Sequence, residues 1–584
     1  MDNQLSDDLG VFVPAYREPE GGQGLFAAFE PGTRVLPAGF RVEPRFAPLP
    51  VAIVMDKDVT VTLRDGITIY VDVLRPAGDE KVPVLVAWSP YGKSRGNAAQ
   101  YVDLLSLLGL DLSKLSGLEK FEAPDPAWWV ARGYAVCNPD PRGSYRSEGD
   151  IRWWSRFEGQ DYHDLIEFLG VQDWCSGKVA TCGNSWLAIS QWFAAAERPP
   201  HLAAIAPWEG MSDIYRDFIM RGGFPDTPFP RELAKSLVGA NMREDLIVEA
   251  EQHPLMDALW KTKIPAFENI DVPAYIVASY SQSIHTPGTF RAWRNIASKD
   301  KWLRVHNTME WPDFYDEAHQ ADLLRFYDHF LKGAENGWRE TPRVRFSILD
   351  LEGNDRVDVP AAEFPPGDFE QKRLYLDADA GALAAHAPAD QAKASYDAES
   401  EDGRVSFTIR VEEPTEFVGY PKVRLWLEAV GSDDMDVFVF LQKLDVLGTP
   451  LEQFNVPNHG PKMEALTRNG AAILKYKGSN GRLRVSTRRL DEALSTDAIP
   501  VHAFDRVEKL APGQVVPVDI DMFPVALALG AGEQLRLIVT GFHILGGVFP
   551  GRENVTADNH GRHVVHTGGD RASFLQLTAR KPGT

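Results

Sequence analysis

One serine stands between a short apolar run and a helical pattern, where a nucleophile could be exposed. Ser185 follows a Gly-Asn pair and the apolar run at residues 178–182, and the helical pattern begins at Trp186. A sharp strand-to-helix turn would expose the serine hydroxyl and place the Trp186 backbone N–H where an oxyanion develops. Such turns favour a small residue two positions after the serine, where this chain has Leu187. An ordinary helix N-cap serine is the alternative interpretation.

Composition limits the classes of partner. The chain has 584 residues, enough for several domains, and its formal net charge of −22 argues against binding nucleic acid or an anionic membrane. Three cysteines are too few for a disulfide framework. The first residues lack the basic and apolar regions of a signal peptide, and no apolar run reaches the ~20 residues of a membrane span. We therefore expect a cytoplasmic protein whose partners include neither nucleic acid nor a membrane; a small-molecule partner remains.

The pattern of elements predicts two domains after an N-terminal arm at residues 1–45. Short apolar runs alternate with helical patterns through residues 46–340, which indicates an α/β domain with a mostly parallel sheet. Segments 101–125 and 211–268 look helical and would cap the edge of the sheet where ligands bind. Residues 341–584 carry many short β-rich runs, which predict a jelly-roll β-sandwich.

Several motifs together resemble one family. They include Ser89-Pro-Tyr-Gly-Lys93 and Gly183-Asn-Ser-Trp-Leu-Ala188, with further matches at residues 64–76, 140–149, 172–178 and 325–333. The chain resembles the cocaine esterase/X-Pro dipeptidyl-peptidase group of α/β-hydrolases from about residue 53 to the end. The resemblance implies a serine hydrolase core, a helical cap and a C-terminal jelly roll that together enclose one pocket. It implies no cofactor, and it makes a homo-oligomer an expectation.

The resemblance also assigns roles around the serine. Ser185 takes the position of the nucleophile, and Tyr91 and the Trp186 amide take those of the oxyanion donors. In the family an acid follows the strand that corresponds to residues 273–278, and a histidine follows the next strand. Here the first loop has no carboxylate, and Glu310 stands where the histidine is expected. Both partners of the nucleophile therefore depart from the family pattern.

Three arrangements could replace the missing partners. His306, at the end of its own strand, is the first candidate base, and His285 in the acid's loop is the second. Glu209 and Asp213 follow the strand at residues 202–206 and could orient a base from the other side. Glu310 could instead act alone as a general acid or base, because burial would raise its pKa. Structural histidines and a solvated entrance to the cap are the alternative interpretations.

Aromatic residues near these motifs suggest a bulky apolar or aromatic acyl substrate, although core packing explains most of them equally well. The candidate substrate-binding residues are Trp88, Trp208, Tyr280, His285 and Trp311. The spacing of His560, His563 and His566 lacks the carboxylates or cysteines of a complete metal site, so no metal is expected.

The leading hypothesis is an ester or amide hydrolase that forms an acyl-enzyme on Ser185. A lyase or isomerase that uses Glu310 as acid or base is the first alternative, and a non-catalytic relative that binds a small molecule is the second.

Overall fold

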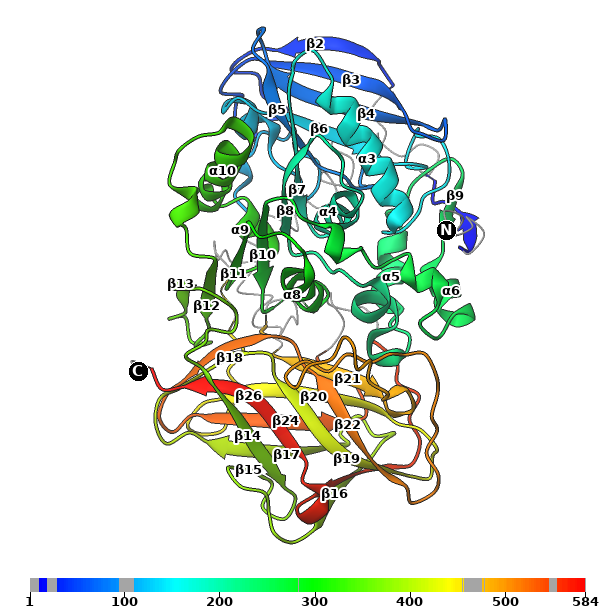
Figure 1. The fold of residues 1–584 in the computed structure, drawn as a ribbon, viewed down its shortest axis with the longest axis vertical. Helices are drawn as coiled ribbons and strands as arrows, with labels where there is room; N and C mark the ends of the chain where they lie inside the picture. The colour runs from blue at the N-terminus through cyan, green and yellow to red at the C-terminus, as the bar shows by residue number, and fades with distance from the viewer. Residues whose placement is uncertain are drawn as a thin grey trace.

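The computed structural model describes residues 10–17, 29–93, 110–281, 283–453, 455, 475–476, 478–545 and 554–582. It contains an α/β domain built on one large sheet and a β-rich domain packed beneath it (Figure 1). The first part of the expected cap at 101–125, residues 101–109, lies outside the described residues.

The large sheet has eleven strands in the order β13-β12-β11-β10-β8-β7-β5-β6-β4-β3-β2. The strands from β6 to β12 run parallel, and antiparallel strands close both edges. The strands of this sheet are β2 (Gly32–Leu36), β3 (Ile53–Thr62), β4 (Thr68–Pro76), β5 (Val82–Val86), β6 (Ala135–Asp140), β7 (Cys175–Asn184), β8 (Leu202–Trp208), β10 (Ala274–Ser279), β11 (Lys301–His306), β12 (Val344–Ile348) and β13 (Arg356–Ala361).

Helices bury the sheet on both faces, which explains why its strands read as nearly continuous apolar runs. Along β7, Val179 lies in the hydrophobic core on one face, and Ala180 and Cys182 lie in the core on the other. Helices α3 (Arg156–Gly170), α4 (Trp186–Ala196) and α8 (Thr286–Asn295) contribute to the first core. Helices α2 (Pro126–Val130), α9 (Glu310–Phe314) and α10 (Glu317–Lys332) contribute to the second. The predicted α/β fold is confirmed.

The two insertions contain less helix than the sequence suggests. Within residues 110–125 the only described helix is a single 3₁₀ turn, η2 (Leu112–Lys114). The turn ends because Leu115 is extended, with a φ of −98° and a ψ of 152°, and Gly117 follows with a φ of 75°. The second insertion contains short elements: η3 (Tyr215–Ile219), η4 (Arg221–Gly223), α5 (Pro228–Ala234), β9 (Met242–Glu244), α6 (Leu246–Gln252), α7 (Ala258–Lys261) and η5 (Phe267–Asn269). The short strand β1 (Phe12–Pro14) of the N-terminal arm pairs with β9.

The C-terminal domain is all-β, as predicted, with three additional strands off its main ladder. Its strands are β14 (Glu370–Asp377), β15 (Ala382–Ala384), β16 (Ala392–Asp397), β17 (Arg404–Arg410), β18 (Thr415–Gly419), β19 (Lys422–Val430), β20 (Asp436–Leu444), β21 (Asn480–Arg484), β22 (Val515–Asp521), β23 (Val525–Leu529), β24 (Gln534–Thr540), β25 (Arg562–Thr567) and β26 (Phe574–Arg580).

The large sheet extends past both expected boundaries of its domain. Strand β2 lies within the expected arm, and β12 and β13 lie within the expected β-sandwich, yet all three belong to the large sheet. A period-two pattern identifies a strand but not the sheet it joins, because pairing partners are distant in sequence. Directly after β12, Leu349 donates its backbone N–H to Ala526 O at 3.0 Å and accepts from Ala528 N at 2.9 Å. This pairing with β23 joins the two domains through the backbone.

Candidate active site

Ser185 has the strained backbone expected of an exposed nucleophile. Its φ of 53° and ψ of −118° lie in a region that residues with a side chain rarely adopt. Ser185 keeps part of its surface exposed, whereas Asn184 and Trp186 on either side are buried. Gly183, with a φ of 131°, has no room for a Cβ, which would lie 2.5 Å from Leu187 Cδ2. The large Leu187 side chain therefore fits the turn because residue 183 is a glycine.

The proposed oxyanion donors lie beside this turn. Helix α4 begins at Trp186, and the first N–H groups of a helix have no acceptor within it. The rings of Tyr91 and Trp186 pack with centroids 6.0 Å apart. The turn itself, the Trp186 amide and Tyr91 are thus brought together at the carboxyl ends of β5 and β7.

Sequence analysis missed the residues that hold the Tyr91 loop. Lys120 is fully buried, and its Nζ donates to Ser89 O at 2.6 Å and to Pro139 O at 2.7 Å. On the other side of Tyr91, the Lys93 backbone N–H donates to Asp140 Oδ1 at 2.7 Å. Burial lowers the pKa of Lys120 to about 7. Nothing in the local pattern around Lys120 marks it, because its three carbonyl acceptors come from two distant strands.

His306 lies at the end of β11, as expected, but both of its ring nitrogens are engaged. Nε2 lies 2.5 Å from Glu209 Oε1, and the backbone N–H of Thr308 donates to Nδ1 at 3.3 Å. Glu209 also accepts a hydrogen bond from Ser279 Oγ at 3.0 Å. In this arrangement neither nitrogen of His306 is left for Ser185. The second acid candidate, Asp213, pairs with Arg216 at 2.6 Å and is engaged elsewhere.

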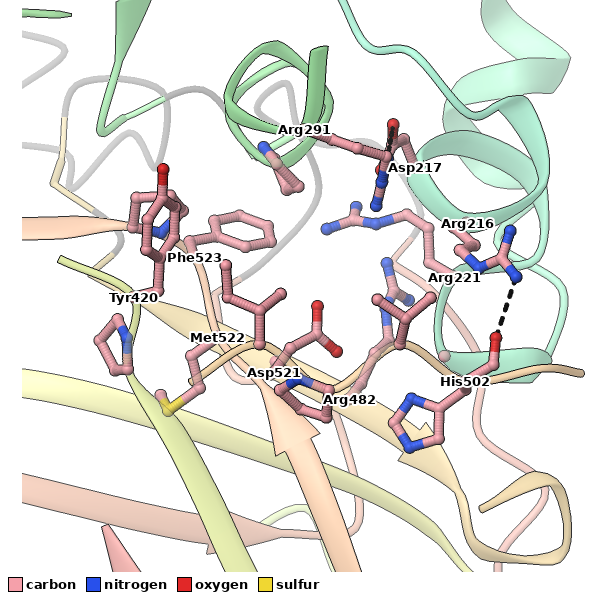
Figure 2. A pocket seen from close by; sticks show the side chains of 18 of the residues that line it. Arg216, Asp217, Arg221, Arg291, Tyr420, Arg482, His502, Asp521, Met522 and Phe523 are labelled. Carbon is pink, nitrogen blue, oxygen red and sulfur yellow. Dashed lines mark hydrogen bonds and ion pairs between the residues drawn. The ribbon is translucent and has the colours of Figure 1, made fainter. Parts of the chain in front are cut away.

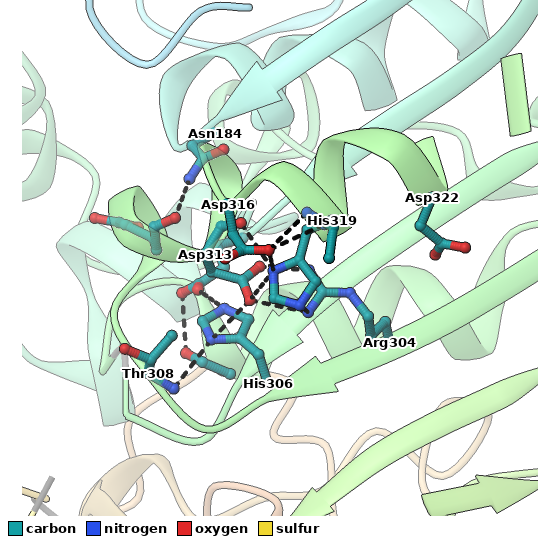
Figure 3. A network of polar contacts seen from close by, with 12 residues as sticks. Asn184, Arg304, His306, Thr308, Asp313, Asp316, His319 and Asp322 are labelled. Atoms are coloured by element: carbon teal, nitrogen blue, oxygen red, sulfur yellow. Dashed lines mark hydrogen bonds and ion pairs between the residues drawn. The ribbon is translucent and has the colours of Figure 1, made fainter. Parts of the chain in front are cut away.

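A second buried network lies next to His306 and is centred on Asp313 (Figure 3). Asp313 forms a bidentate ion pair with Arg304 and accepts from His319 Nδ1 at 3.0 Å. Although burial alone would raise it, the Arg304 guanidinium holds the pKa of Asp313 well below its ordinary value. The Nδ1 atom of His306 lies 3.9 Å from Asp313 Oδ1. These contacts fix the loop that leads from β11 into α9 and so position Glu310.

Glu310 and His285 meet next to the nucleophile turn. The side-chain amide of Asn184 donates to Glu310 O at 3.2 Å, which ties Glu310 to the residue before Ser185. The Oε2 atom of Glu310 lies 3.9 Å from His285 Nε2. His285 Nδ1 has no hydrogen-bond partner among the described residues. Burial lowers the pKa of His285 to about 3, so its ring is neutral at physiological pH.

Glu122 is a further carboxyl group at this turn that sequence analysis did not find. Its backbone carbonyl accepts from Asn184 N at 3.2 Å, and its Oε1 accepts from Trp311 Nε1 at 3.1 Å. Burial, reinforced by the nearby Glu209 charge, raises the pKa of Glu122 to about 8. Glu122 has a φ of 64° and Glu209 one of 57°, so two further segments near Ser185 also carry a residue with positive φ. Such strain gathers at functional sites.

The candidate substrate-binding aromatics fall into two groups. Trp88 stacks on Tyr162 and donates to Glu158 at 2.9 Å, and Trp208 packs edge-on against Phe314. Both side chains are almost fully buried, in the cores on opposite faces of the sheet, which argues for a structural role.

Other aromatics lie closer to the turn. Trp311 is 6.3 Å from the Phe121 ring, which in turn is 5.4 Å from the Tyr91 ring. Tyr280 is buried against Phe290 of α8. Tyr91, Phe121 and Trp311 therefore form an aromatic wall beside Ser185.

Cys182, near the end of β7, and the three histidines at positions 560, 563 and 566 are further side chains that could react or bind a metal. Burial raises the pKa of Cys182 to about 12, which makes its thiolate inaccessible at neutral pH. Each of the three histidines near the C-terminus has its own partner: His560 contacts Glu399, His563 contacts Tyr396, and His566 contacts Glu428. Among the described residues, no cluster of three or more His, Cys, Asp or Glu side chains could hold a metal ion. In the same part of the chain, no helix has both the length and the apolar composition needed to cross a membrane.

Comparisons with known proteins match both domains. Residues 65–233 match the family model of X-Pro dipeptidyl-peptidase (S15 family), and residues 336–576 match that of the X-Pro dipeptidyl-peptidase C-terminal non-catalytic domain. The crystal structure of a CocE/NonD family hydrolase from Staphylococcus aureus is 33% identical, covers 94% of this chain and 97% of that chain, and superposes with a TM-score of 0.85. This chain belongs to the CocE/NonD family of hydrolases.

Two further proteins similar to this CocE/NonD hydrolase are an esterase and an ester hydrolase. The cocaine esterase of a Rhodococcus species is 33% identical over 159 residues, which are 27% of this chain and 24% of that esterase. An α-amino acid ester hydrolase shares the fold, with a TM-score of 0.65 at 16% identity over 90% of this chain and 97% of that chain. The predicted family is confirmed, and with it the class of enzyme, an ester or amide hydrolase.

Proposed function

We propose that this hydrolase cleaves an ester or amide bond of a small molecule through an acyl-enzyme on Ser185. The observation that carries the proposal is the backbone of Ser185, strained and partly exposed at the start of α4. The hydroxyl oxygen attacks the acyl carbon, and the carbonyl oxygen becomes an oxyanion. In this proposal the Trp186 amide and Tyr91 stabilise that charge, as donors beside the nucleophile turn.

The base in this proposal is His285, and Glu310 orients it. The neutral His285 ring accepts the Ser185 proton on Nδ1, while Nε2–H faces the Glu310 carboxylate at 3.9 Å. A contact of this length shortens when substrate binds, as catalytic hydrogen bonds commonly do. The carboxylate then stabilises the imidazolium that forms, the role of the acid in a triad, and so offsets the burial that lowers the pKa of His285 in the free enzyme. His285 returns the proton to the leaving group, and a water activated in the same way releases the acyl group.

The aromatic wall favours a bulky apolar or aromatic acyl group. The rings of Tyr91, Phe121 and Trp311 offer an apolar surface close to Ser185, the kind of lining that small-molecule pockets use. The Glu122 carboxyl group lies beside Trp311 and is protonated at neutral pH because of its raised pKa of about 8. It supplies a hydrogen-bond donor to a polar atom of the substrate without adding negative charge.

A fluorophosphonate probe tests the nucleophile directly. Attack by an activated serine forms an O–P bond and expels fluoride, so the wild-type chain gains the mass of one probe on the peptide that contains Ser185. The Ser185→Ala variant should gain none, and Ser190→Ala, which alters a buried serine of the same helix, should label as the wild type does. Labelling that survives in Ser185→Ala, or an unlabelled wild type, refutes the acyl-enzyme.

A second candidate function uses the carboxyl groups without an acyl-enzyme. Glu122, Glu209 and Glu310 surround the turn, and a protonated Glu122 near a charged partner could form an acid–base pair for elimination or isomerisation. This candidate predicts solvent-deuterium exchange into a substrate, unchanged in Ser185→Ala and abolished in Glu310→Gln. The acyl-enzyme predicts no such exchange in any variant and a loss of hydrolysis in Ser185→Ala, so the two variants separate the functions.

A further inference from the structure

A pocket rich in arginine lies between the α/β domain and the β-rich domain (Figure 2). About 940 Å³ of empty space lies between its lining residues, part of it open to solvent. Five arginines line it, two from the segment before α5, two from α8 and one from β21: Arg216, Arg221, Arg291, Arg294 and Arg482.

Helix α8 separates this pocket from the candidate active site. Pro287, Arg291 and Arg294 lie on the face that lines the pocket. The opposite face is bound to the large sheet, since Thr286 Oγ1 donates to Ser279 O at 2.9 Å and Thr289 Oγ1 contacts Gly210 O at 3.1 Å. The residues that form the active site are absent from the lining of the pocket. A ligand bound there is therefore distinct from the acyl substrate.

Four carboxylates lie near the five guanidinium groups, which leaves one positive charge over: Asp217 and Asp521 line the pocket, and Asp213 and Asp226 pair with its arginines. Arg291 pairs with Asp217, and Arg216 pairs with Asp213 at 2.6 Å. Arg221 and Arg482 share the single carboxylate of Asp226. Arg294 stacks over the Tyr420 ring at 4.6 Å and has no carboxylate within ion-pair distance in the described part of the chain.

Unused donors remain on this surface. Arg482 is 9% exposed, yet its Nη1 has no hydrogen-bond partner among the described residues, and the same holds for Arg216 Nε. Figure 2 shows the side chains of Arg221, Arg291 and Arg482 extending towards the same space from different elements. Leaving a buried donor of a charged group unsatisfied is costly. A bound acceptor would remove that cost.

Repulsion between Arg221 and Arg482 is a second reason to expect an anion in this pocket. Burial, together with the neighbouring Arg482 charge, lowers the pKa of Arg221 to about 9. An anion between the two guanidinium groups would offset the repulsion. The chain as a whole carries a net charge of −22, so a cluster of arginines is opposite in sign to the rest of the molecule. Such a cluster attracts anions that the remaining surface repels.

We infer that this pocket binds a small polyanion, a molecule with two or more negative charges on phosphate or carboxylate groups. Planar guanidinium forks form paired hydrogen bonds with both kinds of group. Arg294 and Arg482 approach from different domains, so one ligand with two charged groups can contact both. The ligand would link the β-rich domain to α8, the helix that His285 precedes.

Titration calorimetry with the whole chain tests the inference. Pyrophosphate and citrate serve as the probes, and acetate and sodium chloride at equal ionic strength serve as the controls. We expect one saturable site for pyrophosphate, citrate or both, and none for acetate or chloride. Binding of pyrophosphate alone identifies a phosphate ligand, and binding of citrate alone identifies a polycarboxylate. Absence of saturable binding by both probes overturns the inference.

Two variants place the site. Arg294→Gln should weaken binding about tenfold or more, because a charged hydrogen bond is lost. Arg132→Gln is the matched control, since Arg132 also stacks on an aromatic ring, at 3.6 Å from Trp128, and has no ion pair with a carboxylate among the described residues. It should bind as the wild type does. Equal weakening in both variants, or none in Arg294→Gln, overturns the assignment to this pocket. Hydrolysis of an aryl ester by Arg294→Gln without the probes should remain unchanged.

Discussion

His285 Nε2 lies 3.9 Å from Glu310 Oε2, and the two residues come from the loops that follow β10 and β11. The family pattern places an acid in the first of these loops and a histidine in the second. In the proposed site the two residue types are therefore exchanged between the loops. An imidazole and a carboxylate can serve a nucleophile from either side, because the chemistry depends on their contacts and not on their order in the chain.

The exchanged pair should act as one unit. His285→Gln and Glu310→Gln are each expected to lower the hydrolysis rate of an activated aryl ester by about 10²–10⁴-fold, the contribution of a positioned general base. The double variant should be no slower than the slower single variant, because residues of one catalytic unit are not additive. His329→Gln, which alters a half-buried histidine of α10 that contacts Ala334 O, is the control. Losses that multiply in the double variant would contradict a shared role.

His306 should contribute to stability and not to proton transfer. His306→Leu leaves the buried Glu209 carboxylate without its imidazole partner, and we expect a loss of about 3–5 kcal/mol in the free energy of unfolding. The labelling rate of the folded fraction by a fluorophosphonate should stay close to that of the wild type. Urea unfolding and labelling kinetics measure the two quantities. A variant of unchanged stability whose labelling falls by 10²-fold or more would instead make His306 the base.

Much of the fold and the sharp turn at Ser185 could be predicted because their signals are local. The apolar run before Ser185, the glycine and the helical pattern after it lie within one short segment. The pairing of His285 with Glu310 could not be predicted in this way, since it depends on how two loops approach each other. The roles of Lys120 and Glu122 could not be predicted from the sequence for a related reason. Their segment was interpreted as a helical cap, whereas its polar groups turn inward to the sheet edge.

Replacing Ser185 should separate strain from function. Its φ of 53° and ψ of −118° are accessible to glycine without a penalty. We expect Ser185→Gly to be more stable than Ser185→Ala by about 1–3 kcal/mol, because alanine keeps the strain of a side chain in this region. Both variants should fail to react with the fluorophosphonate. Chemical denaturation compares the two variants, and equal stabilities would mean that the turn stores no strain at this residue.

Glu122 should make stability depend on pH. Burial raises its pKa from 4.5 to about 8, so the folded chain keeps a proton there that the unfolded chain releases. This contribution to stability is complete below pH 4.5 and is lost as the pH rises through 8. Glu122→Gln cannot ionise, so its stability relative to the wild type should rise over the same range. Unfolding curves at pH 5 and pH 9 give the comparison; a difference that does not change with pH would exclude a raised pKa at Glu122.

The pairing of Leu349 with β23 has a consequence for how the molecule can move. Two buried amide hydrogen bonds, at 3.0 and 2.9 Å, connect the chain after β12 to β23 of the other domain. Rotation of one domain against the other at this junction would have to break both bonds, which makes it costly. Movement of the loops above the strand ends breaks neither, so it is the less costly way to admit a substrate.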